Sequence, residues 1–364
     1  MTIRLRDALA AQPTAPLAFL PTPLHEAPRF AAELGGPRVF FKREDMTGLA
    51  IGGNKTRKLH YALGQAVRDG ADVFIGGAGT AQSNHARQCA AAARKLGMKP
   101  VLVLTEGPEN QRRMQGNLLL DYLLGAEVHF VGPERVKADA LPRFHLAHVM
   151  EEIAEDYRAR GHRPFVLPTS SVPEAAVGYA AGAVELDDQL RALDLRPTHL
   201  YITSTGSSLA GLLLGSRALR REDPAAPLPD AMVGIACGDL GRAHFEAVAR
   251  LFNAAADILG MPERLAPDGV SLKHHGGPGY GLLTEEARDA TLLLARTEGV
   301  LIDPVYTAKG LAGMIADVRA GELGPDDVVI FVHTGGFPAI FAYERELTQG
   351  FSYFDRDAAE ASTV

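Results

Sequence analysis

Residues 199–220 read HLYITSTGSSLAGLLLGSRALR, and this short stretch joins two kinds of hydrophobic pattern. The run 199–203 has the β-branched and aromatic composition of a buried strand, and 209–219 has the spacing of a helix. Between them lies a turn of small and hydroxyl residues, 204–208. A strand that leads through such a turn into a helix is the repeating unit of α/β proteins, so this stretch indicates the fold class.

The same alternation extends from this stretch towards both ends of the chain. Strands are predicted at Val39 to Lys42, Asp72 to Gly76, Val101 to Thr105, Glu127 to Val131, Pro164 to Leu167, His199 to Thr203, Met232 to Cys237 and Val328 to His333. Helices are predicted at about 54–69, 84–97, 111–124, 144–160, 174–193, 208–220, 242–259, 284–298 and 308–320. The pattern predicts parallel sheets with helices on both faces and ligands beyond the carboxyl ends of the strands.

Length and composition narrow the class of protein further. A chain of 364 residues suggests two domains, at roughly 150 residues each. The net charge of −7, without a block of like charges, argues against a nucleic-acid or anionic-membrane partner. The longest apolar runs are strand-sized, far short of the roughly 20 residues that a membrane span needs. No apolar run of secretory length follows the first residues, so we expect a cytoplasmic protein.

The cysteines exclude a disulfide scaffold and give no sign of a metal site. The chain has two, Cys89 and Cys237, and it lacks CxxC, HExxH and any paired metal-ligand spacing. Both lie among small apolar residues, and we predict that both are buried core thiols.

Lys55 is the residue whose sequence context most directly indicates a chemical role. It follows Gly52 and Gly53, which let a ligand approach the backbone closely, and Asn54, which can cap the next helix. The helix dipole and partial burial both lower the pKa of an amine in a first helical turn. The neutral amine is the form needed for a Schiff base, and the alternative is a solvated lysine at a helix start.

Two strand-to-helix turns could bind anions. The turn 204–208 offers consecutive N–H groups and several hydroxyls, which suit the phosphate of a compact cofactor, since it lacks the P-loop lysine and GxGxxG. The turn Gln82-Ser83-Asn84-His85 offers donors for a carboxylate or a phenolate. The alternatives are an ordinary serine-rich N-cap and a capping serine with a solvated histidine. Arg87 is expected to be a surface or packing residue.

Taken together and in this order, the segments resemble the pyridoxal-phosphate (PLP) enzymes of the tryptophan-synthase-β-like fold, called fold type II. Within that group they are most similar to D-cysteine desulfhydrase and 1-aminocyclopropane-1-carboxylate (ACC) deaminase. The matching segments are LPTPL (20–24), FKRED (41–45), GGNKTRKL (52–59), QSNHARQ (82–88), GYG (279–281), DPVYT (303–307) and HTGG (333–336). The resemblance implies a larger PLP-binding domain from 1–53 and 164–364, a smaller domain from 54–163, an active site in the cleft between them, and a homodimer.

The resemblance also implies a role for each matching residue. Lys55 would carry PLP, Asn84 would contact its 3′-oxygen, and Thr307 would face its ring nitrogen. Cofactor-binding residues would be Lys55, Asn54, Asn84, Ser204, Thr205, Gly206, Ser207, Ser208, Thr307 and Thr334. Substrate-binding residues would be Gln82, Ser83, Asn84, His85, Tyr280 and Tyr306, and the catalytic residues Lys55, Ser83, Tyr280 and Tyr306. For the two tyrosines, the residues alone leave open a lid contact and a core aromatic.

The residue that follows Tyr306 affects which reaction we expect. It is glutamate in ACC deaminases and Thr307 here, and a neutral hydroxyl gives a weaker electron sink at the ring nitrogen. We therefore expect β-elimination, with D-cysteine giving pyruvate, sulfide and ammonia, ahead of ACC deamination. L-cysteate sulfo-lyase, amino-acid racemase and a cofactor-free binding module stay open. Departures from the family pattern lie at Ser204, Ser207, 169–174, Phe337 and Pro338.

Overall fold

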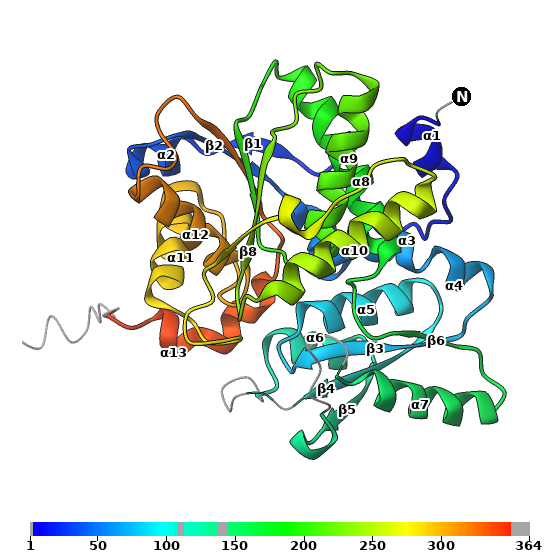
Figure 1. The fold of residues 1–364 in the computed structure, drawn as a ribbon. Helices are drawn as coiled ribbons and strands as arrows, with labels where there is room; N and C mark the ends of the chain where they lie inside the picture. Colours follow the sequence, from blue (N-terminus) through cyan, green and yellow to red (C-terminus); the bar gives the residue numbers. More distant parts are fainter. Residues whose placement is uncertain (1–2, 106, 108–112, 137–144, 351–364) are drawn as a thin grey trace, which may run out of the picture.

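The larger of two sheets forms the upper half of the molecule (Figure 1). The structure is a computed structural model that describes residues 3–105, 107, 113–136 and 145–350. Six strands pair in the order β1-β2-β10-β7-β8-β9, and all neighbours are parallel except β1 and β2. Their bounds are β1 (Leu24–Glu26), β2 (Arg38–Lys42), β7 (His199–Ile202), β8 (Ala231–Ala236), β9 (Ser271–His274) and β10 (Val328–Val332).

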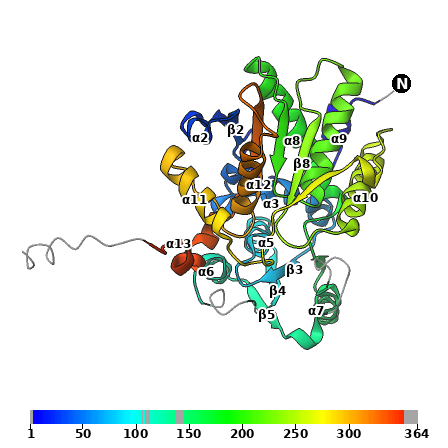
Figure 2. The ribbon, with the colours of Figure 1, turned by 60° about the vertical axis from the view of Figure 1, so that its left-hand side comes forward.

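The two faces of this sheet are covered by different helices because successive side chains of a strand point to opposite sides. On β10, Ile330 and Val332 pack with α8 (Pro173–Ala192), α9 (Ser207–Glu222) and α10 (Arg242–Leu259). The alternate residues, Val329 and Phe331, pack with α2 (Pro28–Leu34), α11 (Glu285–Glu298) and α12 (Thr307–Arg319). Figure 2 shows α11 and α12 on one side of β8 and α9 and α10 on the other.

The smaller sheet has four parallel strands in the order β5-β4-β3-β6. They are β3 (Val73–Thr80), β4 (Lys99–Thr105), β5 (Glu127–Val131) and β6 (Pro164–Leu167). Phe74 faces α3 (Asn54–Ala62) and α5 (Asn84–Lys95), whereas Val73 and Ile75 face α7 (Ala147–Ala159). The register of β3 and β4 shifts between Gly77 and Thr80, at the end of β3 that leads to Ser83.

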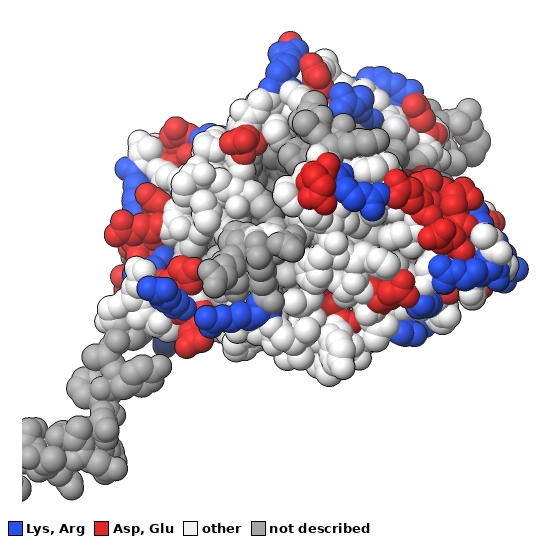
Figure 3. All heavy atoms as spheres, turned by 90° about the horizontal axis from the view of Figure 1, so that it is seen from below, with Lys and Arg blue, Asp and Glu red and all other residues white. Residues whose placement is uncertain are grey.

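The remaining elements are short. They are α1 (Leu5–Ala10), α4 (Gly64–Arg68), α6 (Gly116–Leu123), α13 (Glu344–Leu347) and the 3-10 turns η1 (Glu44–Met46), η2 (Leu49–Ile51), η4 (Pro133–Arg135), η6 (Pro267–Gly269) and η7 (Phe337–Tyr343). On the face shown in Figure 3, Lys and Arg are interspersed with Asp and Glu. Among the described residues, no helix combines the length and apolar character that a membrane span requires.

The α/β class with two mainly parallel sheets is confirmed, and all eight predicted strands are present. The predicted helix 54–69 is wrong in one respect, because it breaks at Leu63 into α3 and α4. Gly64 there touches the Pro13 backbone so closely that a Cβ would lie 2.2 Å from the Pro13 oxygen. The predicted helices 111–124 and 144–160 begin outside the described residues. The division into 1–53 with 164–364 and 54–163 stays a prediction, and β6 pairs with β3 of the smaller sheet.

Candidate active site

The site lies where the carboxyl ends of strands from both sheets meet the first turn of α3. Lys55 belongs to that turn, and its amine interacts with Asp303 and Cys237 from the larger half and with Arg87 and Cys89 of α5. Such an edge is where parallel α/β sheets bind their ligands. Lys55 is thus surrounded by the segments that the sequence singled out.

Burial lowers the pKa of the Lys55 amine, and the nearby Arg87 charge adds to this, whereas the Asp303 carboxylate opposes it. The amine lies 5.2 Å from the centre of the Tyr306 ring. Gly53 precedes the helix with φ of 129°, and a Cβ there would lie 2.3 Å from Nε2 of Gln88. The chain therefore needs glycine to bring Lys55 this close to α5.

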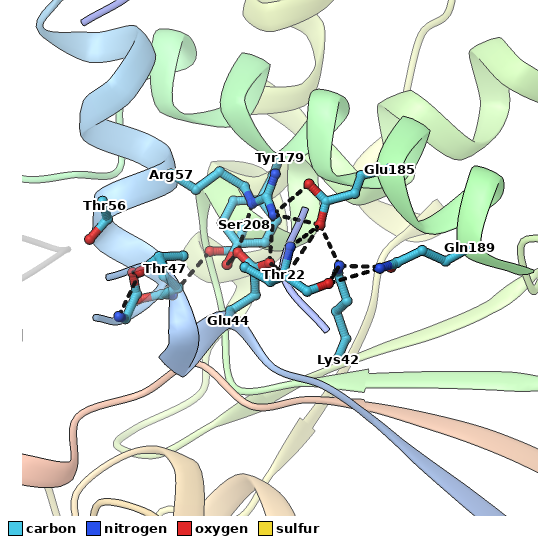
Figure 4. Close-up of polar contacts among 12 residues, drawn as sticks. Thr22, Lys42, Glu44, Thr47, Thr56, Arg57, Tyr179, Glu185, Gln189 and Ser208 are labelled. Carbon is cyan, nitrogen blue, oxygen red and sulfur yellow. Dashed lines mark hydrogen bonds and ion pairs between the residues drawn. The ribbon is translucent and has the colours of Figure 1, made fainter. Parts of the chain in front are cut away.

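A buried ion-pair network fixes α3 in place (Figure 4). The Arg57 guanidinium donates to both oxygens of Glu44 at 2.7 Å, and also to Glu185 of α8 at 3.1 Å. Lys42 pairs with the same Glu185 carboxylate. Burial opposes ionisation of Glu44, but Arg57 lowers its pKa overall. Because Arg57 is two residues from Lys55, the network sets the position of the helix turn that carries the amine.

Two tyrosines from separate loops meet beside Lys55. The Tyr280 and Tyr306 hydroxyls lie 2.7 Å apart, and their rings form an edge-to-face pair with centres 5.8 Å apart. Burial raises the pKa of Tyr306, so its hydroxyl stays protonated. A Cβ on Gly79 would lie 3.4 Å from Ser83 Oγ and 3.6 Å from Tyr280 Oη. The structure thus brings all four predicted catalytic side chains, Lys55 included, to one place.

Ser83 and Asn84 begin α5. Ser83 is the N-cap, and its hydroxyl accepts a bond from the Ala86 N–H at 3.2 Å. Asn84 Oδ1 accepts from Asn117 Nδ2 at 2.8 Å, and this bond fixes the side chain. A Cβ on Gly336 would lie 2.5 Å from Asn84 Nδ2, so the free side of the amide faces the HTGG turn. The Ser83 hydroxyl and the Asn84 amide are thereby held in place at the start of α5.

Gln82 and His85, the other two residues of the turn 82–85, differ in the groups that they offer to a substrate. Burial, with the Lys55 and Lys58 charges, lowers the pKa of His85 to about 3, so its ring is neutral. Gln82 donates to the Gln115 oxygen at 3.0 Å and accepts from the Asn117 N–H at 2.9 Å. Both polar ends of Gln82 are therefore engaged with the chain before and within α6, which favours a structural role.

The turn 204–208 begins α9, a helix of 16 residues whose N-cap Gly206 gives no side-chain cap. Ser207 donates to the Ser170 oxygen at 2.8 Å, and Ser208 Oγ lies 3.5 Å from Asn54 Nδ2. Asn54 is 2% exposed, and its Oδ1 has no hydrogen-bond partner among the described residues. Buried polar atoms usually have a partner, so this oxygen could accept a bond from a donor group beside it.

The threonines of the two last motifs form one buried cluster. Thr307 Oγ1 lies 2.9 Å from Asp303 Oδ2, 3.1 Å from Thr334 Oγ1 and 2.9 Å from the Gly335 oxygen. Thr307 is fully buried, whereas Thr334 is 6% exposed. Burial raises the pKa of Asp303, although N–H bonds from Tyr306 and Thr307 oppose this. Thr307 is thus enclosed by its neighbours, and Thr334 is slightly more exposed.

Sequence reasoning missed two residues of the site, Asp303 and Cys237. Asp303 lies in the motif DPVYT, which gave no sign of its role, and its carboxylate is the acidic group that interacts with Lys55. Cys89 is a buried core thiol as predicted, but Cys237 is only half-buried and interacts with Lys55 and Tyr280. Arg87 is fully buried and donates to the Gly52 oxygen at 3.1 Å, so it is a packing residue, one of the two alternatives that the sequence predicted. Its place within QSNHARQ was the available signal.

The comparisons with known proteins agree with this geometry. A family model described as pyridoxal-phosphate dependent enzyme matches residues 16–335. The chain is 37% identical over 342 residues to a 1-aminocyclopropane-1-carboxylate deaminase of Burkholderia cenocepacia, covering 91% of this chain and 96% of that protein. It is 35% identical over 346 residues to a putative ACC deaminase of Pyrococcus abyssi, covering 94% and 98%.

Two solved structures place the fold. The crystal structure of an ACC deaminase homologue has a TM-score of 0.82 at 34% identity, over 96% of this chain and 99% of that chain. Apo diaminopropionate ammonia lyase of Escherichia coli, at 19% identity with a TM-score of 0.63 over 96% and 93%, shows the fold alone. The chain belongs to the PLP-dependent enzymes of fold type II, in the ACC deaminase/D-cysteine desulfhydrase family.

The residues present fit PLP. A Cβ on Gly336 would lie 2.4 Å from Asp303 Oδ2 as well as 2.5 Å from Asn84 Nδ2, so only a glycine leaves this space open. The start of α9 offers backbone donors and hydroxyls for a phosphate, and the Nδ2 donor of Asn54 lies 3.5 Å from Ser208 Oγ. Among the described residues, no three His, Cys, Asp or Glu side chains are grouped to hold a metal ion.

Proposed function

We propose that the protein is a β-eliminating lyase that converts D-cysteine into pyruvate, sulfide and ammonia. PLP attached to Lys55 supplies the electron sink for electrons released at the α-carbon. In this proposal, Asn84 and Thr334 orient the ring of the cofactor and the turn 204–208 binds its phosphate. The Ser83 hydroxyl and the N–H groups at the start of α5 bind the substrate carboxylate.

The proton transfers are assigned to residues of the same site. Once the substrate amine has replaced it on the cofactor, the free Lys55 amine would take the α-proton, because burial lowers its pKa towards the neutral form that a base requires. The Tyr280–Tyr306 hydroxyl pair, 2.7 Å apart, is placed to protonate the leaving sulfur as the bond from the β-carbon breaks. His85 is neutral, so it contacts the substrate as a hydrogen-bonding group and not as a cation.

One observation carries the choice of elimination over ring opening. The position at which ACC deaminases have glutamate holds Thr307, a neutral hydroxyl enclosed by Asp303, Thr334 and Gly335. No carboxylate stands at that position to keep the ring nitrogen protonated, so the sink is weaker. A weaker sink suffices to expel a good leaving group such as sulfide.

ACC deamination is the second candidate, and two observations favour it. Relatives at 35% to 37% identity are named ACC deaminases. The Asp303 carboxylate also lies one hydrogen bond behind Thr307, so negative charge is near the position of the missing glutamate. L-cysteate elimination and racemisation are further outcomes of the same test.

A substrate panel decides among these activities. The PLP-loaded protein is given D-cysteine, L-cysteate, β-chloro-D-alanine and ACC, with Lys55→Ala as the control. The proposal predicts pyruvate and sulfide from D-cysteine at a higher kcat/KM than any product from the other natural candidates. Faster 2-oxobutyrate formation from ACC would establish the second candidate instead. A homodimer and a cytoplasmic location stay predictions, and light scattering tests the first.

A further inference from the structure

We propose that Lys309 is a positioning residue that sets the geometry of the Tyr280–Tyr306 hydroxyl pair. The proposal rests on the proposed function, in which that pair contacts the substrate. Lys309 lies in the first turn of α12 and is fully buried. It was not among the residues that the sequence motifs singled out.

The three N–H groups of the Lys309 ammonium all bind backbone carbonyls. Its Nζ donates to the oxygens of Gly276 at 2.6 Å, Gly279 at 2.8 Å and Cys237 at 3.2 Å. Three such bonds use the full donor capacity of the group. Lys309 therefore holds the backbone at three points, and we call these three bonds the Lys309 clamp.

The clamped segments are those that form one wall of the site. Cys237 follows β8, and the loop 276–279 leads directly to Tyr280. Tyr306 is the N-cap residue of the helix that carries Lys309. One side chain thus connects the segments of both tyrosines, and on the far side the Tyr343 hydroxyl donates to the Gly281 oxygen at 2.5 Å. Tyr280 is held between these two anchors.

The energetics favour a positional role over simple filling of the core. Burial lowers the pKa of Lys309, which means that the surroundings disfavour the charged form. An apolar side chain of the same length would avoid that cost, so stability alone does not explain a lysine here. What the ammonium provides, and methionine cannot, is a fixed distance to three carbonyls at once.

The test is a double-mutant cycle of Lys309→Met and Tyr280→Phe on the PLP-loaded protein. If Lys309 positions Tyr280, then Tyr280→Phe lowers kcat/KM by about 10²-fold in the parent and by less than about 3-fold in the Lys309→Met background. A merely structural role gives equal losses in both backgrounds and overturns the proposal. Lys309→Gln keeps two donors and should restore part of the coupling.

A second measurement does not depend on turnover. Hydrogen exchange of cofactor-free proteins reports on the amide of His275, which donates to the Ala236 oxygen at 3.0 Å next to the clamp. Lys309→Met should speed exchange of the peptide 275–281 by about 10-fold. The matched control is Lys273→Met, because Lys273 binds the side chains of Asp317 and Glu322 and should leave this peptide unchanged. Equal exchange of this peptide in the parent and Lys309→Met overturns the proposal. If Lys309→Met speeds the exchange but the parent turns over no substrate, only the proposed function is contradicted.

Discussion

Thr307 Oγ1 lies 2.9 Å from Oδ2 of Asp303, so the hydroxyl of the residue that follows Tyr306 is bonded to a buried carboxylate. The same carboxylate accepts the backbone N–H bonds of Val305 and Tyr306. Asp303 therefore fixes the turn that carries Tyr306 and Thr307 and places a negative charge behind them. This relationship bears directly on the reaction, because charge near the cofactor ring tunes its strength as a sink.

Thr307→Glu is expected to shift the visible absorption of the bound cofactor and to lower D-cysteine elimination. The new carboxylate would stand at the ring nitrogen beside Asp303, and we expect a loss on the order of 10²-fold in kcat/KM. The neutral Thr307→Gln is the matched control for size. An unchanged spectrum in Thr307→Glu would show that residue 307 is remote from the ring.

Ser208→Ala is expected to weaken PLP binding by about 10- to 100-fold, since a hydrogen bond to a charged phosphate contributes about 1.5 to 3 kcal/mol. Titration of the cofactor-free protein by absorbance measures the Kd. Ser216→Ala, a buried serine further along the same helix, should leave the Kd unchanged. Equal affinities for Ser208→Ala and the parent would remove the turn 204–208 from the phosphate site.

Arg57→Met is expected to lower the free energy of unfolding by about 3 to 5 kcal/mol, because it leaves the buried Glu44 carboxylate without its partner. Urea unfolding measures the change. Arg158→Met removes an exposed arginine of α7 and should change stability little. If the two variants have the same stability, the network of Figure 4 does not hold α3 in place.

The stability difference between the parent and His85→Gln is expected to depend on pH. In the folded protein the His85 pKa is about 3, below the ordinary 6.5. Between these values the unfolded chain binds more protons at this position, so acid favours unfolding. The parent should therefore lose stability relative to His85→Gln as the pH falls from 6.5 towards 3, in urea unfolding at several pH values. A constant difference would mean that His85 titrates normally.

The strands could be predicted from sequence because each is a short apolar run next to a turn signal. β1 and β9 were missed for a physical reason: they are three and four residues long and only half-buried, so neither has a hydrophobic period to detect. The helices α1 and α2 were missed as well, because their six and seven residues span fewer than two full turns and give no helical period to detect.

The candidate site could be predicted where the local sequence indicates the chemical role of a residue, as at Lys55 and Ser83. The roles of Asp303 and Lys309 could not be predicted from the sequence, because they depend on atoms that come together only in the fold. Asp303 binds N–H groups of the turn that follows it, and Lys309 binds carbonyls some 30 and 70 residues away. A buried lysine and a surface lysine look alike in a sequence.

The attachment of PLP to the Lys55 amine is the claim on which the proposed function depends. Borohydride reduction of the PLP-loaded protein, followed by peptide mapping, measures it directly. We predict a reduced pyridoxyl group on Lys55 in the peptide that contains GGNKTRKL, and no label in Lys55→Ala at this position. A label on another lysine, or no label at all, would contradict the account.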